Sequence, residues 1–495
     1  MVAGFIDKHG LWSAEQQLQA KALAARAAKD NLKLFRLAWP DPHGASRAKT
    51  VTLPAFLGAL RDGYNINVAS TTLDASGARI FASFTRGGGM GLEEMTGSPN
   101  LVIVPDPATF RVLPWEPNVG WVLCDEYFVS GVPFHFSPRQ LLRRQLARLA
   151  ERGMDCMVGL EVEWYLRRVA ENRLTDEHIG APGFKGRAIG TEPVEPGFSY
   201  HSESNFDLVQ PVANALADAF EKLGLPVRSL ENEWGAGQVE CTFAPKLALE
   251  AADNLVLFRS ATRQICRRLG YLASFMCWPG VKGAYPSGWH LHQSLISNKD
   301  GQNLFVPESK GEFLSPTGKH YLGGLMRFAL ASTVFGNPTV NSYRRFRQNS
   351  LAPDRVSWGS DHRGTMLRVL GNVGDPASRI ENRLGEPWAN PYLYIASQLI
   401  AGLDGIDHQR NPGPPDTDPY ATQHPMLPKS LGEALQLMEK EPLFLDGFGR
   451  VFTDYYLRFK RSELQRFETF VHEHTIDPAS SDTTEWEQNE YFDFF

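Results

Sequence analysis

The sequence predicts an α+β protein whose larger part is a mainly antiparallel β-sheet with helices packed on one side. The first observation is a series of short, strand-like segments in the second part of the chain: MVGLEVEWYL, QVECTF, WHLHQSL and SRIENRL. The second is the helical pattern of segments between them, such as AADNLVLFRSATRQICRRLG. The third is a change near residue 137, where strand-like segments give way to the helix-like SPRQLLRRQLARLAERGMD.

The part of the chain before this change divides into two regions. Residues 1–30 have the pattern of an amphipathic helix without an apolar signal core. Short strands follow around a DPHG turn, LKLFRLAW before it and RAKTVTLPAF after it, and NLVIVPD is a further strand. We therefore expect a helical extension over 1–30, a smaller domain over 31–136 and a larger domain over 137–495.

Composition limits the classes of function. A length of 495 residues favours two domains over three, and the net charge of −6 argues against nucleic acid as a partner. No apolar run reaches the roughly 18 residues that a membrane span needs, so we expect no membrane partner. The five cysteines are scattered and form no CxxC motif, which is typical of a reducing compartment. The sequence therefore predicts a cytoplasmic protein.

The strongest chemical signal is the pair Glu161 and Glu163 in GLEVEWYL. Residues i and i+2 of a strand point to the same face, so the two carboxylates project side by side. A solvated strand face explains most such pairs. Here the flanking residues are apolar, and two half-buried carboxylates repel one another unless they are protonated or bridged by a cation.

The same logic applies to three further pairs, although any one of them could be structural. They are Glu233 with Glu240 across a GAGQ turn, His290 with His292, and Glu381 with Arg383. Carboxylates with an imidazole suit the hard ions Mg²⁺ or Mn²⁺ better than a Cys/His zinc site. Such metal sites beside several arginines indicate phosphoryl transfer from a nucleotide.

These segments, in this order, resemble the glutamine synthetase family of ATP-dependent ligases. The motifs that carry the resemblance are ExE in GLEVEWYL, ENEWGAGQVE, WHLHQSL, NPTVNSYRR at 337–345, and E-x-R, ANPYL and AGLDGI between 381 and 406. The resemblance implies a β-grasp N-terminal domain over 31–136 and a catalytic domain over 137–495. It also implies a homo-oligomer of stacked rings, a dodecamer in first place and a decamer as the alternative, with active sites between neighbouring subunits.

The resemblance further implies roles for individual residues. One metal ion would be held by Glu163, Glu233 and Glu240. The other, which bridges the ATP phosphates, would be held by Glu161, His290 and Glu381. Arg345 would bind the α-carboxylate of glutamate, while Arg363 and Arg383 would act in catalysis on the transferring phosphoryl group. His292, Ser294 and Arg368 would contact the nucleotide.

The chemistry implied by the resemblance has two steps: ATP phosphorylates the side-chain carboxylate of glutamate, and an amine then displaces the phosphate. The sequence departs from the family at positions that would bind the amine. Glutamine synthetases carry a glutamate six residues after the substrate arginine, where it binds ammonium, and this chain has Leu351. A further acidic position of the ammonium site corresponds to Asp74, which we expect to be catalytic.

The loss of that glutamate changes the expected amine. A cation that enters a closed site needs carboxylates, because desolvation of an unpaired charge is costly. Leu351 therefore favours a larger amine with an apolar body, such as an arylamine. Trp234, Tyr285 and Trp289 could form a platform for it, or could simply pack the core. The segment GAYPSGWH replaces the family's Asn-Gly at the donor site, but the retained Arg345 still favours glutamate.

The sequence thus predicts a ligase, dependent on ATP and on Mg²⁺ or Mn²⁺, that joins glutamate to an aryl- or alkylamine such as aniline. The alternatives are a γ-glutamylpolyamine ligase, glutamine synthetase itself, and a ring-forming pseudoenzyme. Two other arginines of NSYRRFRQ, Arg344 and Arg347, have no implied role, and solvent is their expected environment.

Overall fold

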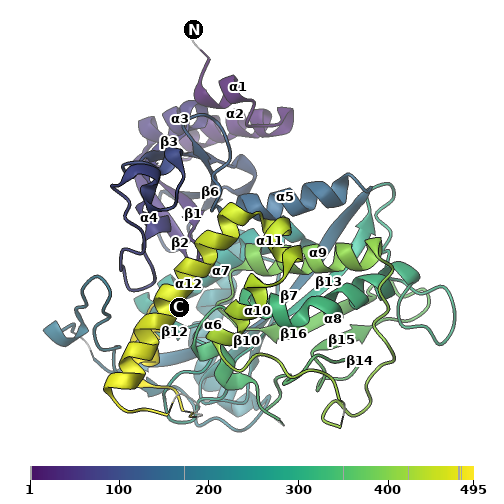
Figure 1. Cartoon of the computed structure of the whole chain (residues 1–495). Helices are drawn as coiled ribbons and strands as arrows, with labels where there is room; N and C mark the ends of the chain where they lie inside the picture. Colours follow the sequence, from purple (N-terminus) through teal and green to yellow (C-terminus); the bar gives the residue numbers. More distant parts are fainter. Residues whose placement is uncertain (1–2, 172, 349, 422, 478–479, 481) are drawn as a thin grey trace.

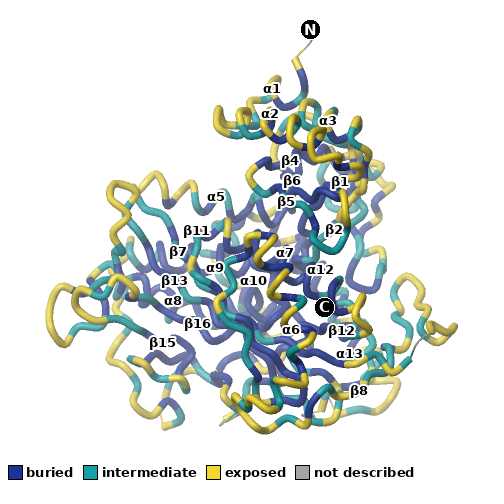
Figure 2. The backbone as a smooth tube through the Cα atoms, turned by 180° about the vertical axis from the view of Figure 1, so that it is seen from behind, coloured by how far each residue is buried: buried dark blue, intermediate teal, exposed yellow. Residues whose placement is uncertain are grey.

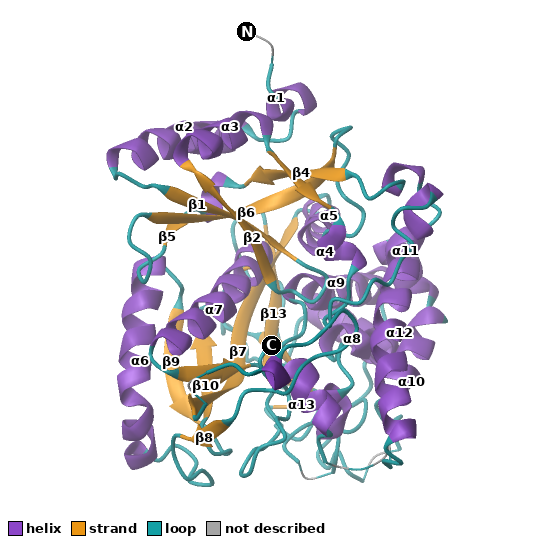
Figure 3. Cartoon of the chain, turned by 90° about the vertical axis from the view of Figure 1, so that its left-hand side faces the viewer, coloured by secondary structure: helices purple, strands orange, loops and turns teal. Residues whose placement is uncertain are grey.

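Two β-sheets organise the chain in the computed structural model, which describes residues 3–171, 173–348, 350–421, 423–477, 480 and 482–495. The smaller sheet has six strands and comes from residues 34–128, and the larger has ten and comes from residues 154–385. Figure 3 shows strands β1 and β6 of the smaller sheet above β7, β10 and β13 of the larger one. The mixed α+β class predicted from the sequence is confirmed.

The smaller sheet is preceded by two helices where one amphipathic segment was expected. Helix α1 ends at Gly10, whose φ of 61° is a left-handed conformation that glycine adopts without strain. Helix α2 then begins with a capping box between Ser13 and Gln16. The elements of this region are α1 (Phe5–His9), α2 (Ala14–Lys29), β1 (Leu34–Pro40), β2 (Ser46–Thr52), α3 (Leu53–Asp62), β3 (Tyr64–Asn67), α4 (Ala69–Thr72), β4 (Asn100–Pro105), β5 (Arg111–Val112) and β6 (Val119–Phe128).

The strand order of the smaller sheet is β2-β1-β6-β4-β3, with β5 paired to β6. Its strands pair antiparallel except β1 and β6, which are parallel. The predicted strands after the DPHG turn and at NLVIVPD are present as β2 and β4. The expected strand RAKTVTLPAF is shorter, because its LPAF end forms the first turn of α3 with Pro54 near the helix start.

The larger sheet is mainly antiparallel, as predicted. Its order is β14-β15-β16-β13-β7-β10-β9, with β8, β11 and β12 also paired to β7, and only β14 and β15 run parallel among the described residues. Its strands are β7 (Met154–Val169), β8 (Thr191–Pro193), β9 (Val227–Asn232), β10 (Gln238–Phe243), β11 (Lys246–Leu247), β12 (Tyr271–Ser274), β13 (Trp289–Ser297), β14 (Trp358–Ser360), β15 (Leu367–Leu370) and β16 (Arg379–Gly385).

Helices cover the apolar face of this sheet. Tyr321 on α8 donates a hydrogen bond to Gln293 on β13, and Tyr394 on α9 lies edge-on against Trp289. The helices of the larger part are α5 (Pro138–Ala150), α6 (Glu203–Leu223), α7 (Ala248–Arg268), α8 (Pro316–Gly336), α9 (Pro391–Asp407), α10 (Leu431–Glu439), α11 (Pro442–Phe448), α12 (Arg450–Glu473) and α13 (Glu485–Tyr491).

One continuous apolar core joins the two sheets (Figure 2), and a buried arginine connects them. Arg139 on α5 bonds to Asp106 and Asp125 of the smaller region and to Asp253 on α7. Because a buried guanidinium requires such partners, these three carboxylates fix α5 against the smaller region and against α7. Helix α12 crosses toward the smaller region as well (Figure 1), where Tyr455 donates to the carbonyl of Thr71.

Candidate active site

The register of the larger sheet brings the predicted site residues onto one face. Antiparallel pairing places Glu161 of β7 opposite His290 of β13, and Glu163 opposite Glu240 of β10. On the far side of β13, His292 lies opposite Glu381 of β16. Directly opposed residues lie about 5 Å apart, so pairs that are distant in sequence become one polar cluster.

Glu161 lies at the centre of this cluster. Its Oε1 is 2.6 Å from Nδ1 of His290, and its Oε2 is 3.2 Å from Nε2 of His292. The Arg379 guanidinium donates to Nδ1 of His292 at 3.1 Å, so Nδ1 is the acceptor and Nε2 carries the proton that faces Glu161. This arginine was not predicted, although it shares the strand face of Glu381 and Arg383 at the same two-residue spacing.

Glu381 is fully buried and is paired with two of the predicted arginines. Arg383 bonds to its Oε1 at 2.5 Å and Arg368 bonds to its Oε2 at 2.9 Å. Nδ1 of His290 is 3.7 Å from the same carboxylate. Although burial opposes ionisation, His290, Arg383 and His292 hold the pKa of Glu381 below its usual value.

The neighbouring carboxylates of Glu240 and Glu233 differ from Glu381, because their pKa values are raised. Burial, followed by the charges of Glu161, Glu163 and Glu233, raises the pKa of Glu240 to about 11. Burial and the charge of Glu163 raise the pKa of Glu233 to about 8. Protons on these carboxyls therefore balance part of the negative charge of the cluster. A bound divalent cation would balance the same charge in their place.

The residues present fit a hard divalent ion. Among the described residues, two groups have donor atoms that all lie within 4.8 Å of one another: Glu161, Glu240 and His290, and Glu161, His292 and Glu381. Carboxylates, which supply two of the three donors in each group, are the ligands that Mg²⁺ and Mn²⁺ prefer, and neither group contains a cysteine. The grouping differs from the predicted one, because Glu161 belongs to both groups and His292, predicted as a nucleotide contact, belongs to one.

Two cavities meet at this cluster, and Glu161 lines both of them. The first has a volume of about 950 Å³ and includes Ser294, His292 and Arg379. The second has a volume of about 920 Å³ and is lined by most of the other predicted residues: Glu163, Trp234, Glu233, Glu240, Tyr285, His290, Arg345, Leu351, Arg363, Arg368 and Arg383. We refer to them below as the first and the second cavity.

Arg345 is held in the second cavity by backbone carbonyls. Its Nη1 donates to the carbonyls of Leu384 and Gly385 at 2.6 and 2.7 Å, and the residue is only 3% exposed. A Cβ at Gly288 would come within 2.9 Å of Nη2 of Arg345, so a larger residue at this position would displace the guanidinium. Gly288 also donates its N–H to Glu163 at 3.0 Å, a role that the sequence did not reveal.

Three of the four residues predicted for the amine pocket line the second cavity. Leu351 is 68% exposed on its wall, together with the half-buried Tyr285 and with Trp234. The prediction that Trp289 faces an amine is wrong, because it is fully buried against Tyr394. The alternation of a strand explains this: Trp289 directly precedes His290, so the two side chains point to opposite faces of β13.

Asp74 does not reach either cavity of its own chain within the described residues. Its carboxylate is buried, and it accepts hydrogen bonds from Ser76 at 2.6 Å and from Arg466 on α12 at 2.9 Å. A desolvated carboxylate needs such a cationic partner. Within the single chain Asp74 is therefore a structural partner of Arg466, and its catalytic role at a site between neighbouring subunits stays a prediction.

Sequence reasoning missed several residues of the second cavity. Tyr200 and His201 come from the loop before α6, and Glu231 precedes the predicted Glu233 by two residues. Gln238 was visible inside GAGQVE, and its Nε2 donates to Glu163 at 2.8 Å. The loop residues had no sequence signal, because the backbone bonds Phe198 to Trp234 and His201 to Asn232 bring them in from outside any motif.

The fold and the site together define one protein family. The family model described as the glutamine synthetase catalytic domain matches residues 135–478. This chain belongs to the glutamine synthetase family.

Individual relatives are similar over almost the whole chain. It is 42% identical over 493 residues to γ-glutamylanilide synthase of an Acinetobacter species, which covers 99% of this chain and 98% of that protein. It is 30% identical over 456 residues to glutamate–isopropylamine ligase of a Pseudomonas species, 90% of this chain and 94% of that protein. A solved complex of GmaS with ADP superposes with a TM-score of 0.73 and 28% identity, over 92% of this chain and 99% of that chain.

In the part of the chain that the structure describes, no helix combines the length and the hydropathy that a bilayer span requires.

Proposed function

We propose that the protein is an ATP-dependent carbon–nitrogen ligase that forms a γ-glutamyl amide from glutamate and an amine other than ammonia, with an arylamine such as aniline in first place. The observation that carries this proposal is the position of Leu351 in the cavity of Arg345, where glutamine synthetases have an ammonium-binding glutamate. Trp234, Tyr200 and Tyr285 line the same cavity and suit an aromatic ring. The 42% identity to γ-glutamylanilide synthase supports the same amine class.

An alkylamine is the second candidate, and the similarity to glutamate–isopropylamine ligase favours it. A polyamine is disfavoured, because its several charges would need carboxylates or cation–π contacts where Leu351 stands. A pseudoenzyme is disfavoured because five of the six predicted metal-binding residues line the second cavity, and the sixth, Glu381, pairs with Arg368 and Arg383 on its wall.

The two substrates, ATP and glutamate, are assigned to different cavities. We assign ATP to the first cavity, where His292, Ser294 and Arg379 line the wall. A divalent cation held by the carboxylates and imidazoles at the junction would neutralise phosphate charge and orient the phosphate chain. We assign glutamate to the second cavity, with its α-carboxylate on Arg345.

The arginines then act on the phosphoryl group. An oxygen of the glutamate γ-carboxylate attacks the γ-phosphorus, and the bond to ADP breaks. Arg363, Arg368 and Arg383 line the cavity where this charge develops and would stabilise it without forming a covalent bond. The amine nitrogen then attacks the acyl carbon, phosphate leaves, and the nitrogen loses a proton.

We further propose an assembly of stacked rings and a cytoplasmic location, with a helical extension at 1–30, an N-terminal domain at 31–136 and a catalytic domain at 137–495. The start of the family match at residue 135 supports the last boundary. No nucleic-acid partner is proposed, because the net charge is −6.

Phosphate release, measured with ATP, Mg²⁺, glutamate and a panel of amines, tests the proposed function. The panel contains aniline, isopropylamine, putrescine and ammonium, and mass spectrometry identifies each amide. We expect the highest kcat/KM with aniline. The highest kcat/KM with ammonium, or no turnover with any amine, would contradict the proposal.

A further inference from the structure

The turn that carries Arg345 is held by the C-terminal helix. Arg345 ends the 3₁₀ turn Asn341–Arg345, and its neighbour Arg344 points away from the cavity toward α13. Nε and Nη2 of Arg344 donate to the two carboxylate oxygens of Glu487 at 2.5 and 2.6 Å. The side chains of this pair are 7% and 0% exposed, so the solvent environment expected for Arg344 is wrong. Such a two-pronged bond fixes the orientation of the guanidinium as well as its distance from the carboxylate.

The same carboxylate connects the start of the turn to the start of the helix. Oε1 of Glu487 accepts a hydrogen bond from Nδ2 of Asn341 at 3.1 Å. Oε2 accepts from the backbone N–H and the hydroxyl of Thr484, which completes the capping box of α13. One buried side chain therefore holds the first and the fourth residue of the turn.

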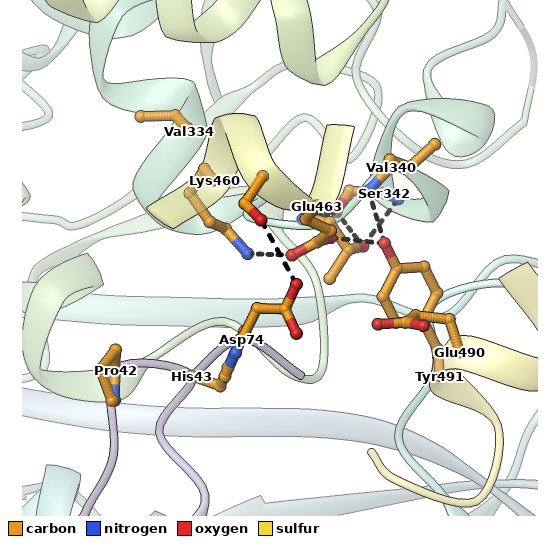
Figure 4. A network of polar contacts seen from close by, with 12 residues as sticks. Pro42, His43, Asp74, Val334, Val340, Ser342, Lys460, Glu463, Glu490 and Tyr491 are labelled. Atoms are coloured by element: carbon orange, nitrogen blue, oxygen red, sulfur yellow. Dashed lines mark hydrogen bonds and ion pairs between the residues drawn. The ribbon is translucent and has the colours of Figure 1, made fainter. Parts of the chain in front are cut away.

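A second contact holds the residue before the turn (Figure 4). The N–H of Val340 donates to the hydroxyl of Tyr491 on α13, and this hydroxyl donates to Glu463 on α12. Lys460 balances the charge of Glu463 at 2.7 Å, and both of these side chains are buried. Helices α12 and α13 therefore hold Val340, which precedes the turn, as well as Asn341 and Arg344 within it.

The positive charges of Arg344 and Arg345 are balanced in different ways. Arg344 and Arg345 are adjacent and buried, and Glu487 neutralises Arg344 alone. The guanidinium of Arg345 bonds only to backbone carbonyls among the described residues, and its Nε has no partner there. Of these two adjacent arginines, Arg345 is therefore the one whose positive charge remains for an anion in the second cavity.

We propose that Glu487 and Arg344 are positioning residues, which fix the orientation of Arg345 and thereby set the affinity for the carboxylate substrate. The proposal rests on the proposed function, because it takes Arg345 as the group that binds the α-carboxylate of glutamate. It assigns a part in substrate binding to the C-terminal helix, which is far from Arg345 in the sequence.

The test compares two variants of the same helix in the full-length protein. Glu487→Gln removes the charge partner of Arg344. Glu490→Gln is the matched control, since Glu490 is equally buried and its pair with Arg466, at 2.7 Å, touches no part of the turn. The measurements are the melting temperature, the KM values for glutamate, ATP and aniline, and the Kd of glutamate by calorimetry, which does not depend on turnover.

We expect Glu487→Gln to raise the KM and the Kd of glutamate about tenfold, with the KM of ATP and aniline within about twofold of wild type. Glu490→Gln should lower the melting temperature without changing the KM of glutamate. If Glu487→Gln does not fold, Arg344→Lys, which keeps the charge but loses the two-pronged bond, is expected to show the same selective effect.

An unchanged glutamate Kd in a folded variant, or a parallel rise of all three KM values, would overturn the proposal. Failure of the proposed function is a separate outcome, seen as wild-type protein that binds glutamate but forms no amide.

Discussion

The proposed amine class is inferred mainly from a single aliphatic residue, Leu351. It is 68% exposed on the wall of the second cavity, and its φ of 64° lies in the left-handed region that glycine favours. An apolar side chain there offers an ammonium ion no counter-charge, whereas an arylamine that is neutral near pH 7 needs none.

Leu351→Glu should therefore shift preference from aniline toward ammonium. The added carboxylate pairs with the cation and penalises the apolar ring, so the ratio of the two kcat/KM values should change by roughly 10- to 100-fold. Leu351→Gln, which has a similar size without the charge, serves as the control. Equal ratios in Leu351→Glu and Leu351→Gln would show that charge at this position does not select the amine.

Gly288 gives a second prediction at the residue scale. Because a Cβ at this position would lie 2.9 Å from Nη2 of Arg345, Gly288→Ala must displace the guanidinium. We expect the KM for glutamate to rise by roughly tenfold while the melting temperature changes little, since the contact is with the end of a side chain. Steady-state kinetics at saturating ATP measure it, and an unchanged KM would remove Arg345 from the glutamate site.

Some residues could be predicted from the sequence and others could not, for identifiable reasons. The alternation of a strand predicted that Glu161 and Glu163 share a face. The same rule, applied to the strand of His290, would have placed Trp289 in the core. The environment of Arg344 could not be predicted, because its partner Glu487 is 143 positions away and no local pattern connects them.

At the scale of elements, strand pairing creates the site. Strand β7 contributes Glu161 and Glu163, and its neighbours β10 and β13 supply Glu240 and His290 in register. The sequence predicted each strand, since apolar flanks and two-residue spacings are local signals. It did not predict the register, which depends on the pairing of segments that are far apart in the chain. This is why the grouping of the candidate metal-binding residues differs from the predicted one.

Strand β6 provides a prediction for stability. Glu126 is buried in this strand, and burial, with the charges of Asp125 and Asp41, raises its pKa to about 8. Below about pH 4.5 the carboxyl is protonated in both folded and unfolded states, so the raised pKa has no effect on the pH dependence of stability. Between pH 4.5 and 8 only the unfolded state ionises, so the free energy of unfolding falls by up to roughly 1.4 kcal/mol per pH unit.

Glu126→Gln removes this titration. We therefore expect the melting temperature of the variant, relative to wild type, to increase steadily from pH 5 to pH 8 and then to level off. Thermal unfolding across this range measures the difference, in which other titrating groups cancel. A difference independent of pH would mean that Glu126 is ionised in the folded protein.

At the scale of the whole molecule, the structure leaves large apolar side chains exposed on two neighbouring loops. Phe84, Leu174, Ile179 and Phe184 are each about 70% exposed, and the N–H of Gly183 bonds to the carbonyl of Ser76 between these loops. Exposed apolar groups of this kind are typical of surfaces that pack against another subunit. The proposed stacked rings would bury them.

Twelve subunits of 55.2 kDa would give a particle of roughly 660 kDa, and ten would give roughly 550 kDa. We expect light scattering after size-exclusion chromatography to find one of these masses. The mass of a single chain would contradict the proposed assembly while leaving the single-chain site as described.

This member of the glutamine synthetase family is proposed to use an amine other than ammonia, and direct competition between two amines tests this proposal. Enzyme, ATP, Mg²⁺ and glutamate are incubated with equal millimolar concentrations of aniline and ammonium, and mass spectrometry measures both amides. We expect γ-glutamylanilide to exceed glutamine by roughly 100-fold or more, since the wall at Leu351 carries no charge for ammonium. Glutamine as the main product would contradict the proposed use of an amine other than ammonia.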